Sequence, residues 1–178
     1  MKPKVSKKNE LVFLHYINAD GNLDIVGVGN SYASDPLAGY YDAGIGICLL
    51  GNGIGSFHAL NVLRSGFFVD TDAKGLVVLE SALHTPLWLV TANQDSLKVF
   101  EQQTISGPLL FPEAHDAFAE FELYTGKKQK KELYYGAGYL SQSTRGFPIP
   151  AGVRAVYLTN DKGIRRKVWE GKQILSSN

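Results

Sequence analysis

Hydrophobic and polar residues alternate along most of this chain with a period of two, which is typical of β-strands that bury one face. The alternating stretches are rich in Val, Ile, Leu, Phe and Tyr, and turn-forming Gly, Asn, Asp and Pro separate them. The only helical signal is short, around residues 113–118. The pattern predicts strands over residues 11–17, 23–29, 44–50, 56–62, 66–69, 75–80, 86–91, 97–102, 118–124, 131–135, 154–159 and 165–169.

Two of the intervening turns have a clear chemistry. Asn52-Gly53, followed by Ile54-Gly55, lies between two predicted strands, and Asn and Gly tolerate the positive φ that hairpin turns need. Residues 161–163 lie between the last two strands and predict a second hairpin. Many short, evenly spaced strands of this kind indicate a sandwich, a barrel or a propeller.

A weak internal repeat favours the propeller. Residues 21–26 and 72–78 each precede a group of strands, at an offset of about 50 residues that is in the range of propeller blades. Residues 104–116 contain two prolines and predict a linker. We therefore predict an all-β chain: two antiparallel blade-like sheets of a partial β-propeller over residues 11–103, the linker, and a small β-sandwich-like module over residues 117–170.

The composition is that of an ordinary globular protein, with 44% hydrophobic residues, 20% charged residues and a net charge of +1. It does not indicate nucleic acid or an anionic membrane as a partner. Lysines gather in the N-terminal tail and over residues 127–131, where we expect a solvated tail and a solvated hairpin turn, with binding of an anionic partner as the alternative. The single cysteine, Cys48, lies in an apolar run and predicts a buried thiol. No apolar stretch has the length of a membrane span, and we expect no complete signal peptide in this chain.

One segment has the spacing of a calcium loop. Residues 16–24 match the pattern D-x-N-x-D-G-x-x-D except at the first position, where Tyr16 replaces the Asp. Calcium takes six to eight oxygen ligands, so the loss of one carboxylate should weaken or abolish binding. The alternative is a turn held by hydrogen bonds from its own Asn and Asp side chains to its backbone. The predicted ligands are the side-chain oxygens of Asn18, Asp20 and Asp24 and the backbone carbonyl of Asn22.

Two other loops are candidate binding sites. Residues 136–145 combine glycines with polar and aromatic side chains that suit a sugar or a peptide, although such polar groups commonly bond their own loop backbone instead. A second polar-aromatic loop contains three tyrosines near Asp35 and Asp42. The candidate ligand-binding residues are Tyr139, Ser141, Gln142, Ser143 and Arg145 in the first loop and Tyr32, Tyr40 and Tyr41 in the second.

No catalytic residues are predicted. The four histidines show no metal-ligand spacing, and neither a nucleophile elbow nor a dinucleotide-binding glycine motif is present. A site with paired carboxylates would require the fold to bring together residues that are distant in sequence. The carboxylates considered are Asp35, Asp42, Asp70, Asp72 and Glu80.

Beyond these local features, residues 18–26 resemble an FG-GAP/VCBS repeat, the unit of integrin-like propellers. Residues 29–32, 36–43, 49–57 and 65–69 are similar, in the same order, to the last repeats of bacterial FG-GAP proteins. The sequence Tyr-Tyr-Gly-Ala-Gly-Tyr-Leu-Ser-Gln-Ser at residues 134–143 resembles the signature of ASPIC/UnbV modules. The resemblance covers about residues 11–170.

The resemblance implies an extracellular or cell-envelope protein, calcium in the repeat loops, a role in adhesion or ligand binding, and no transferable catalytic residues. Complete members carry further repeats, and two blades alone leave sheet faces without neighbours. The predicted partners are therefore a protein or carbohydrate ligand, the remaining blades of a parent propeller, or a second copy of the chain. We predict a non-catalytic binding or adhesion module, with an envelope scaffold or assembly domain and a carbohydrate-active enzyme as alternatives.

Overall fold

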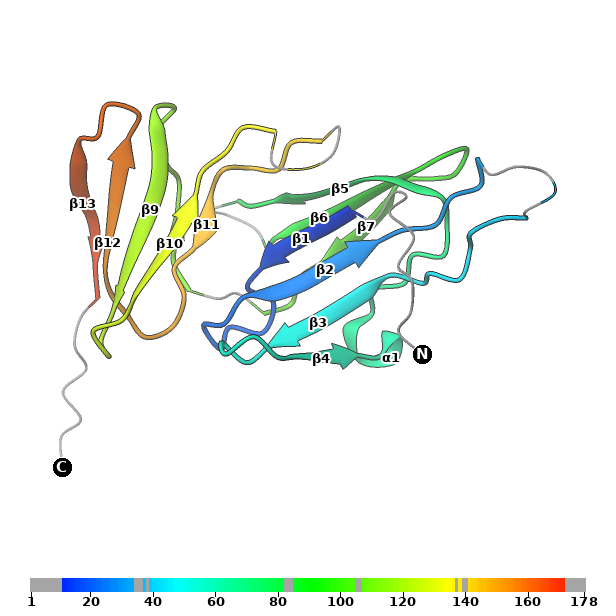
Figure 1. Ribbon diagram of the computed structural model, residues 1–178, viewed down its shortest axis with the longest axis horizontal. Helices are drawn as coiled ribbons and strands as arrows, with labels where there is room; N and C mark the ends of the chain where they lie inside the picture. Colours follow the sequence, from blue (N-terminus) through cyan, green and yellow to red (C-terminus); the bar gives the residue numbers. More distant parts are fainter. Residues whose placement is uncertain are drawn as a thin grey trace.

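The computed structural model of the protein describes residues 11–33, 37, 39–81, 85–104, 107–136, 138 and 141–171. The fold is all-β, as predicted, with several antiparallel sheets and a single one-turn helix among the described residues (Figure 1). None of the sheets closes on itself in this part of the chain.

The first sheet contains β1 (Leu11–His15), β2 (Asp24–Val28), β3 (Ile47–Gly51) and β4 (Phe57–Leu60), paired in the order in which they occur in the chain. The hairpin predicted at residues 52–55 is confirmed, since it joins β3 to β4. The side-chain oxygen of Asn52 accepts hydrogen bonds from Ile54 N and Ser56 N at 3.0 and 3.1 Å. Asn52 therefore closes the turn with its own side chain.

Helix α1 (Val62–Ser65) follows β4 and was not predicted. Asn61 caps its start by accepting a hydrogen bond from Arg64 N, and Gly66 ends it in the left-handed conformation at φ 67°. The strand predicted over residues 66–69 is wrong, because this segment does not join a sheet. Phe67 and Val69 are nevertheless buried, which explains the alternating pattern.

The second sheet contains β5 (Ala73–Leu79), β6 (Leu87–Ala92) and β7 (Lys98–Glu101), again in chain order. It packs against the inner face of the first sheet. Cys48 lies in the shared core, as predicted, and burial raises the pKa of its thiol to about 11, so it remains protonated at neutral pH. The core residues are Leu11, Val26, Val28, Cys48, Phe67, Val69, Ala73, Leu76, Val78, Trp88 and Val90.

The C-terminal sheet has the order β10-β9-β12-β13, formed by β9 (Asp116–Leu123), β10 (Lys128–Glu132), β12 (Val153–Asn160) and β13 (Arg165–Glu170). The hairpin predicted at residues 161–163 is confirmed between β12 and β13. The helix considered around residues 113–118 is wrong, since β9 begins at Asp116.

This sheet has a core of its own, to which a separate sheet of two short strands contributes. Strand β8 (Leu109–Leu110), inside the range predicted as a linker, pairs with β11 (Phe147–Pro148). In Figure 1 the C-terminal sheet stands beside the two packed sheets, with β10 and β11 on the side nearest to them. The second core contains Ala119, Phe121, Leu133, Phe147, Ile149, Val153, Val156 and Leu158.

Candidate functional site

The predicted calcium loop lies between β1 and β2, and its last acidic residue is fully buried. Asp24 Oδ2 accepts a hydrogen bond from Ile17 N at 2.7 Å, and Asp24 Oδ1 accepts one from Gly51 N at 2.9 Å. The carboxylate thus joins the end of β1 to β3. A side chain on Gly51 would overlap the carbonyl oxygen of Leu23, so this approach requires glycine.

The remaining polar side chains of the loop bond one another. Asn18 Oδ1 accepts from Asp20 N at 3.3 Å, and Asp20 Oδ1 accepts from Asn22 N at 2.8 Å. Burial raises the pKa of Asp20, but hydrogen bonds from Asn22 and Asn18 outweigh it and hold the pKa below its ordinary value. This is the arrangement expected of a turn closed by its own side chains.

These groups do not fit a calcium ion well. Asp24 is engaged by two main-chain amides, and Tyr16, in place of the first carboxylate, is buried. In the described part of the chain no group of three or more His, Cys, Asp or Glu residues lies close enough to hold a metal. Calcium binding by this loop stays a prediction.

The second predicted site, residues 141–145, lies along the free edge of β5. Ser143 Oγ accepts from Val78 N at 3.0 Å, and Thr144 Oγ1 accepts from Glu80 N at 2.7 Å. Thr144 N donates to Val78 O at 3.1 Å. Because β5 is the terminal strand of its sheet, these bonds satisfy main-chain groups that a further strand would otherwise pair.

The other described residues of this loop bond nearby groups. Ser141 Oγ donates to Leu76 O at 3.4 Å, and Gln142 accepts a hydrogen bond from Gly136 N. Tyr139 lies outside the part of the chain that the structure describes. The loop thus connects the C-terminal unit, which consists of the C-terminal sheet with β8 and β11, to the edge of the second sheet. This agrees with the interpretation that the polar side chains of the loop form hydrogen bonds with main-chain groups.

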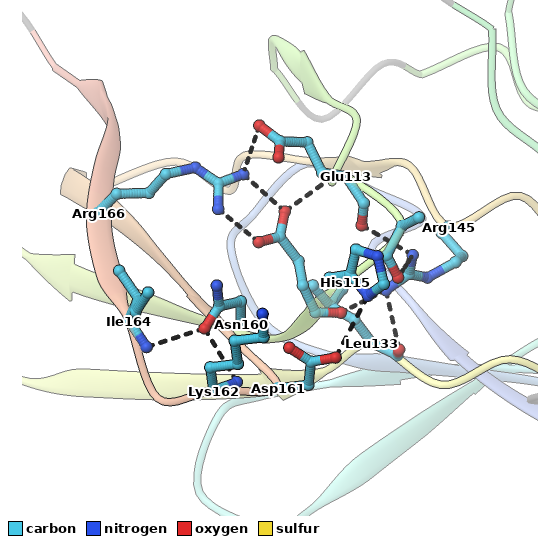
Figure 2. A network of polar contacts seen from close by, with 11 residues as sticks. Glu113, His115, Leu133, Arg145, Asn160, Asp161, Lys162, Ile164 and Arg166 are labelled. Carbon is cyan, nitrogen blue, oxygen red and sulfur yellow. Dashed lines mark hydrogen bonds and ion pairs between the residues drawn. The ribbon is translucent and has the colours of Figure 1, made fainter.

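Arg145 is the centre of the polar network in Figure 2. Its guanidinium donates to the carbonyl oxygens of four residues and to Tyr135 Oη at 2.8 Å, and it lies over the Tyr135 ring at 4.2 Å from the centroid. The four carbonyl groups belong to Glu113, Ala114, Asp116 and Leu133. A guanidinium with this many main-chain acceptors holds the segment before β9 against the end of β10.

An ion pair between the buried Asp116 and the partly exposed Arg166 belongs to the same network (Figure 2). Arg166 of β13 donates to both carboxylate oxygens of Asp116 at 2.6 and 2.8 Å, and to Glu113 at 3.0 Å. Burial raises the pKa of Asp116, but the hydrogen bonds from Arg166 and from Glu113 N outweigh it and lower the pKa overall. The pair fixes the start of β9 to β13.

Of the three tyrosines of the third predicted site, Tyr41 lies at a hollow of about 300 Å³. Tyr32 and Tyr40 have ring centroids 5.0 Å apart, and Tyr32 Oη donates to Asp70 O at 3.1 Å. Tyr41 exchanges two main-chain hydrogen bonds with Ser31 and lines the hollow. The lining of the hollow includes Gly27, where an added Cβ would lie only 3.0 Å from the side chain of Ile47.

The outer face of the first sheet, on the side away from β5–β7, is apolar. The strand register places Val12 beside Gly27 and Gly27 beside Ile47, and it places Leu14, Ile25, Leu49 and Ala59 in the next row. An exposed antiparallel sheet face ordinarily carries polar residues. Here the exposed fractions are 55% for Val12, 52% for Leu14, 48% for Ile47 and 47% for Phe57.

A groove of about 690 Å³ extends from this face to the C-terminal unit, and we name it the β1–β10 groove. Its apolar side includes Val12, Leu14, Leu23 and Phe57. The opposite side is formed by four consecutive residues of β10, Gln129–Glu132, and by Tyr134. Asn22 and Asn52 also line it, so the predicted calcium loop borders the groove. Apolar surface with a few polar groups in this volume range is typical of binding sites.

The described carboxylates do not form a catalytic pair. Asp70 pairs with Lys98 at 2.7 Å, and Asp72 bonds Lys74 and Asn93. Glu80 is buried against His15 Nε2 at 2.9 Å. Asp42 is exposed, and Asp35 lies outside the described residues.

Sequence reasoning missed the outer sheet face and the β10 side of the groove. The run Leu-Val-Phe-Leu at residues 11–14 was a usable signal, because apolar residues at every position give a strand two apolar faces. Nothing local indicates that β10, more than a hundred residues later, lies opposite that strand. The lysines there were expected as a solvated turn, with binding of an anionic partner as the alternative.

Comparison with known proteins gives no further assignment. A scan of the chain against protein-family models, a search of curated proteins and a search of solved structures each found no match. Within the described residues, no helix is both long and apolar enough to cross a membrane.

Proposed function

We propose that this chain is a non-catalytic binding and assembly module that docks a further β-sheet against the outer face of β1–β4. The observation that carries the proposal is the apolar character of that face, on which Val12, Leu14 and Ile47 are about half exposed. Exposed apolar patches of this extent, bordered by polar loops, are typical of interaction surfaces.

The inner face of β1–β4 gives the reason to expect a β-sheet as the partner that docks on the outer face. There Val26, Val28 and Cys48 pack against β5–β7, so β1–β4 already forms one sheet-on-sheet contact within the chain. A second sheet on the outer face would repeat that packing. This is the arrangement expected of blades in a parent propeller, and with it we propose the extracellular or cell-envelope setting that the FG-GAP resemblance implies.

The alternative of an envelope scaffold shares this surface but has a second copy of the chain as the occupant. In either case the isolated chain should associate weakly through the exposed face at high concentration, because apolar area is then removed from water. The two cases differ in whether the dimer is stable at micromolar concentration.

Sedimentation velocity over a concentration series, together with binding of the dye ANS, tests the proposal. We expect wild type to associate reversibly and bind ANS, and Ile47→Glu to reduce both by placing a charge in the centre of the face. Leu63→Glu is the matched control, since Leu63 is exposed on α1, outside the lining of the hollow and of the groove. Equal sedimentation and equal ANS binding by wild type and Ile47→Glu would overturn the proposal.

A further inference from the structure

We infer that the β1–β10 groove binds an extended peptide with alternating apolar and acidic residues, which adds as a strand to the free edge of β10. The inference rests on the proposed function, because one side of the groove is part of the outer face of β1–β4. The inference adds the chemistry of a partner that binds at one end of that face.

The lining of the groove shows that strand edges face it. Successive side chains of a strand point to opposite faces, so a hollow that touches consecutive residues runs along the edge of the strand. The groove touches Gln129–Glu132 of β10 and Val12–Leu14 of β1. Both strands are terminal in their sheets among the described residues. Such edges present main-chain N–H and C=O groups that a peptide strand can pair.

The apolar side of the groove supplies a place for alternate side chains of the added strand. Leu14 and Phe57 are each about half exposed, and Leu23 is 43% exposed. A peptide strand that pairs with β10 points every second side chain toward one face. Apolar residues at those positions would cover this surface, while the intervening residues remain near the lysines.

The charge of β10 selects an acidic peptide and disfavours a second copy of the same strand. Lys128, Lys130 and Lys131 outnumber Glu132 in β10, so two β10 strands side by side would each bring a net positive charge to the shared edge. Lys130 pairs with Glu132 at 2.6 Å and Lys128 with Glu122 at 3.5 Å. Both lysines are more than half exposed, and surface pairs of this kind are worth little, so carboxylates of a peptide can replace them.

Lysines also protect edge strands against unwanted pairing, and that is the competing explanation. Protection alone does not account for the apolar side of the groove, because a strand that avoids partners needs no half-exposed leucine and phenylalanine opposite its edge. The combination of a free edge, an apolar face and lysines is what favours a peptide ligand.

Fluorescence anisotropy with labelled peptides and the full chain tests the inference. The first probe is a capped six-residue peptide of alternating Val and Glu, and the second has Lys in place of Glu. Two further Val-Glu peptides carry N-methyl groups on alternate main-chain amides, one on the amides of the Val residues and the other on those of the Glu residues, which are the two possible registers. We expect binding of the Val-Glu peptide, loss of binding with the Val-Lys peptide, and weakening by N-methylation in one register only, since only one set of amides faces β10.

Variants of the chain locate the site. We expect Leu14→Glu to weaken binding of the Val-Glu peptide by about tenfold or more and Lys130→Glu by roughly three- to tenfold. Lys162→Glu, in the turn between β12 and β13, is the charge-matched control and should leave binding unchanged. The Lys130 side chain is 52% exposed, so Lys130→Glu tests the site even where Leu14→Glu does not fold.

Three outcomes overturn the inference: equal binding of the Val-Glu and Val-Lys peptides, equal effects of N-methylation in both registers, or unchanged binding by Leu14→Glu and Lys130→Glu. Ile47 lies on the outer face but does not line the groove, so the two proposals can be separated. A reduction of self-association by Ile47→Glu without any peptide binding removes the groove inference alone. Failure of both experiments removes the proposed function as well.

Discussion

Asp24 ties three strands together with one carboxylate. It lies at the start of β2 and accepts hydrogen bonds from the amide of Ile17, just after β1, and from the amide of Gly51 in β3. Asp24→Asn keeps the shape but leaves only one acceptor and turns an NH₂ group toward an N–H donor. We expect a loss of about 2 kcal/mol in the free energy of unfolding, measured by urea denaturation. Asp20→Asn, in the exposed part of the loop, is the control and should change it by less than about 0.5 kcal/mol. Equal effects of the two substitutions would contradict this role.

Asp116 makes stability depend on pH. The hydrogen bonds from Arg166 and Glu113 N lower its pKa in the folded state, in spite of burial. A carboxyl whose folded pKa is depressed contributes stability above its unfolded pKa, about 4, and this contribution is lost as the pH falls through the folded pKa. We expect the stability difference between wild type and Arg166→Gln to be constant from pH 6 to 7 and to shrink below about pH 4. Urea denaturation at each pH measures it, and a difference that does not change with pH would contradict the argument.

The loop between β1 and β2 is closed by hydrogen bonds to its own side chains, and these bonds compete with calcium for the same oxygen atoms. Asn18, Asp20 and Asp24 already accept main-chain hydrogen bonds, and an ion would have to displace them. A ligand that binds only the folded state raises the melting temperature. We therefore expect millimolar CaCl₂ or EDTA to shift the melting temperature by less than about 1 °C, as measured by differential scanning fluorimetry. A larger rise with CaCl₂ that EDTA reverses would restore the calcium prediction.

Strands were predictable where turn residues bound an alternating run, as in β2, β4 and β13. Strands β8 and β11 contain two residues each, too few for any periodicity to appear. The local chemistry of residues 18–22 was also readable, since the hydrogen bonds from Asp20 N to Asn18 and from Asn22 N to Asp20 each span two residues, whereas Asp24 bonds Gly51 on another strand. The partners of Arg145 were not, because its acceptors at residues 113–116 and 133 are brought near it only by the folding of the C-terminal unit.

At the scale of the whole molecule, the described residues form two hydrophobic cores, and a short segment links them. Val78 belongs to the first core, and Phe147 belongs to the second. Between them, Ser143 and Thr144 accept hydrogen bonds from the β5 amides of Val78 and Glu80. The segment therefore takes up hydrogen-bonding positions on β5 that a fourth strand would occupy. We expect these bonds to couple the unfolding of one core to that of the other.

The double variant Ser143→Ala/Thr144→Val tests this coupling. Each lost hydroxyl leaves a main-chain amide of β5 without its acceptor, at a cost of about 1–3 kcal/mol. In differential scanning calorimetry we expect one transition for wild type and two for the double variant, with a van't Hoff enthalpy below the calorimetric enthalpy. Ser56→Ala/Thr125→Val removes two exposed hydroxyls and is the matched control. If the double variant unfolds in one transition with the stability of this control, the two cores are coupled by other contacts, among which the His15–Glu80 pair beside Lys131 is the next to test.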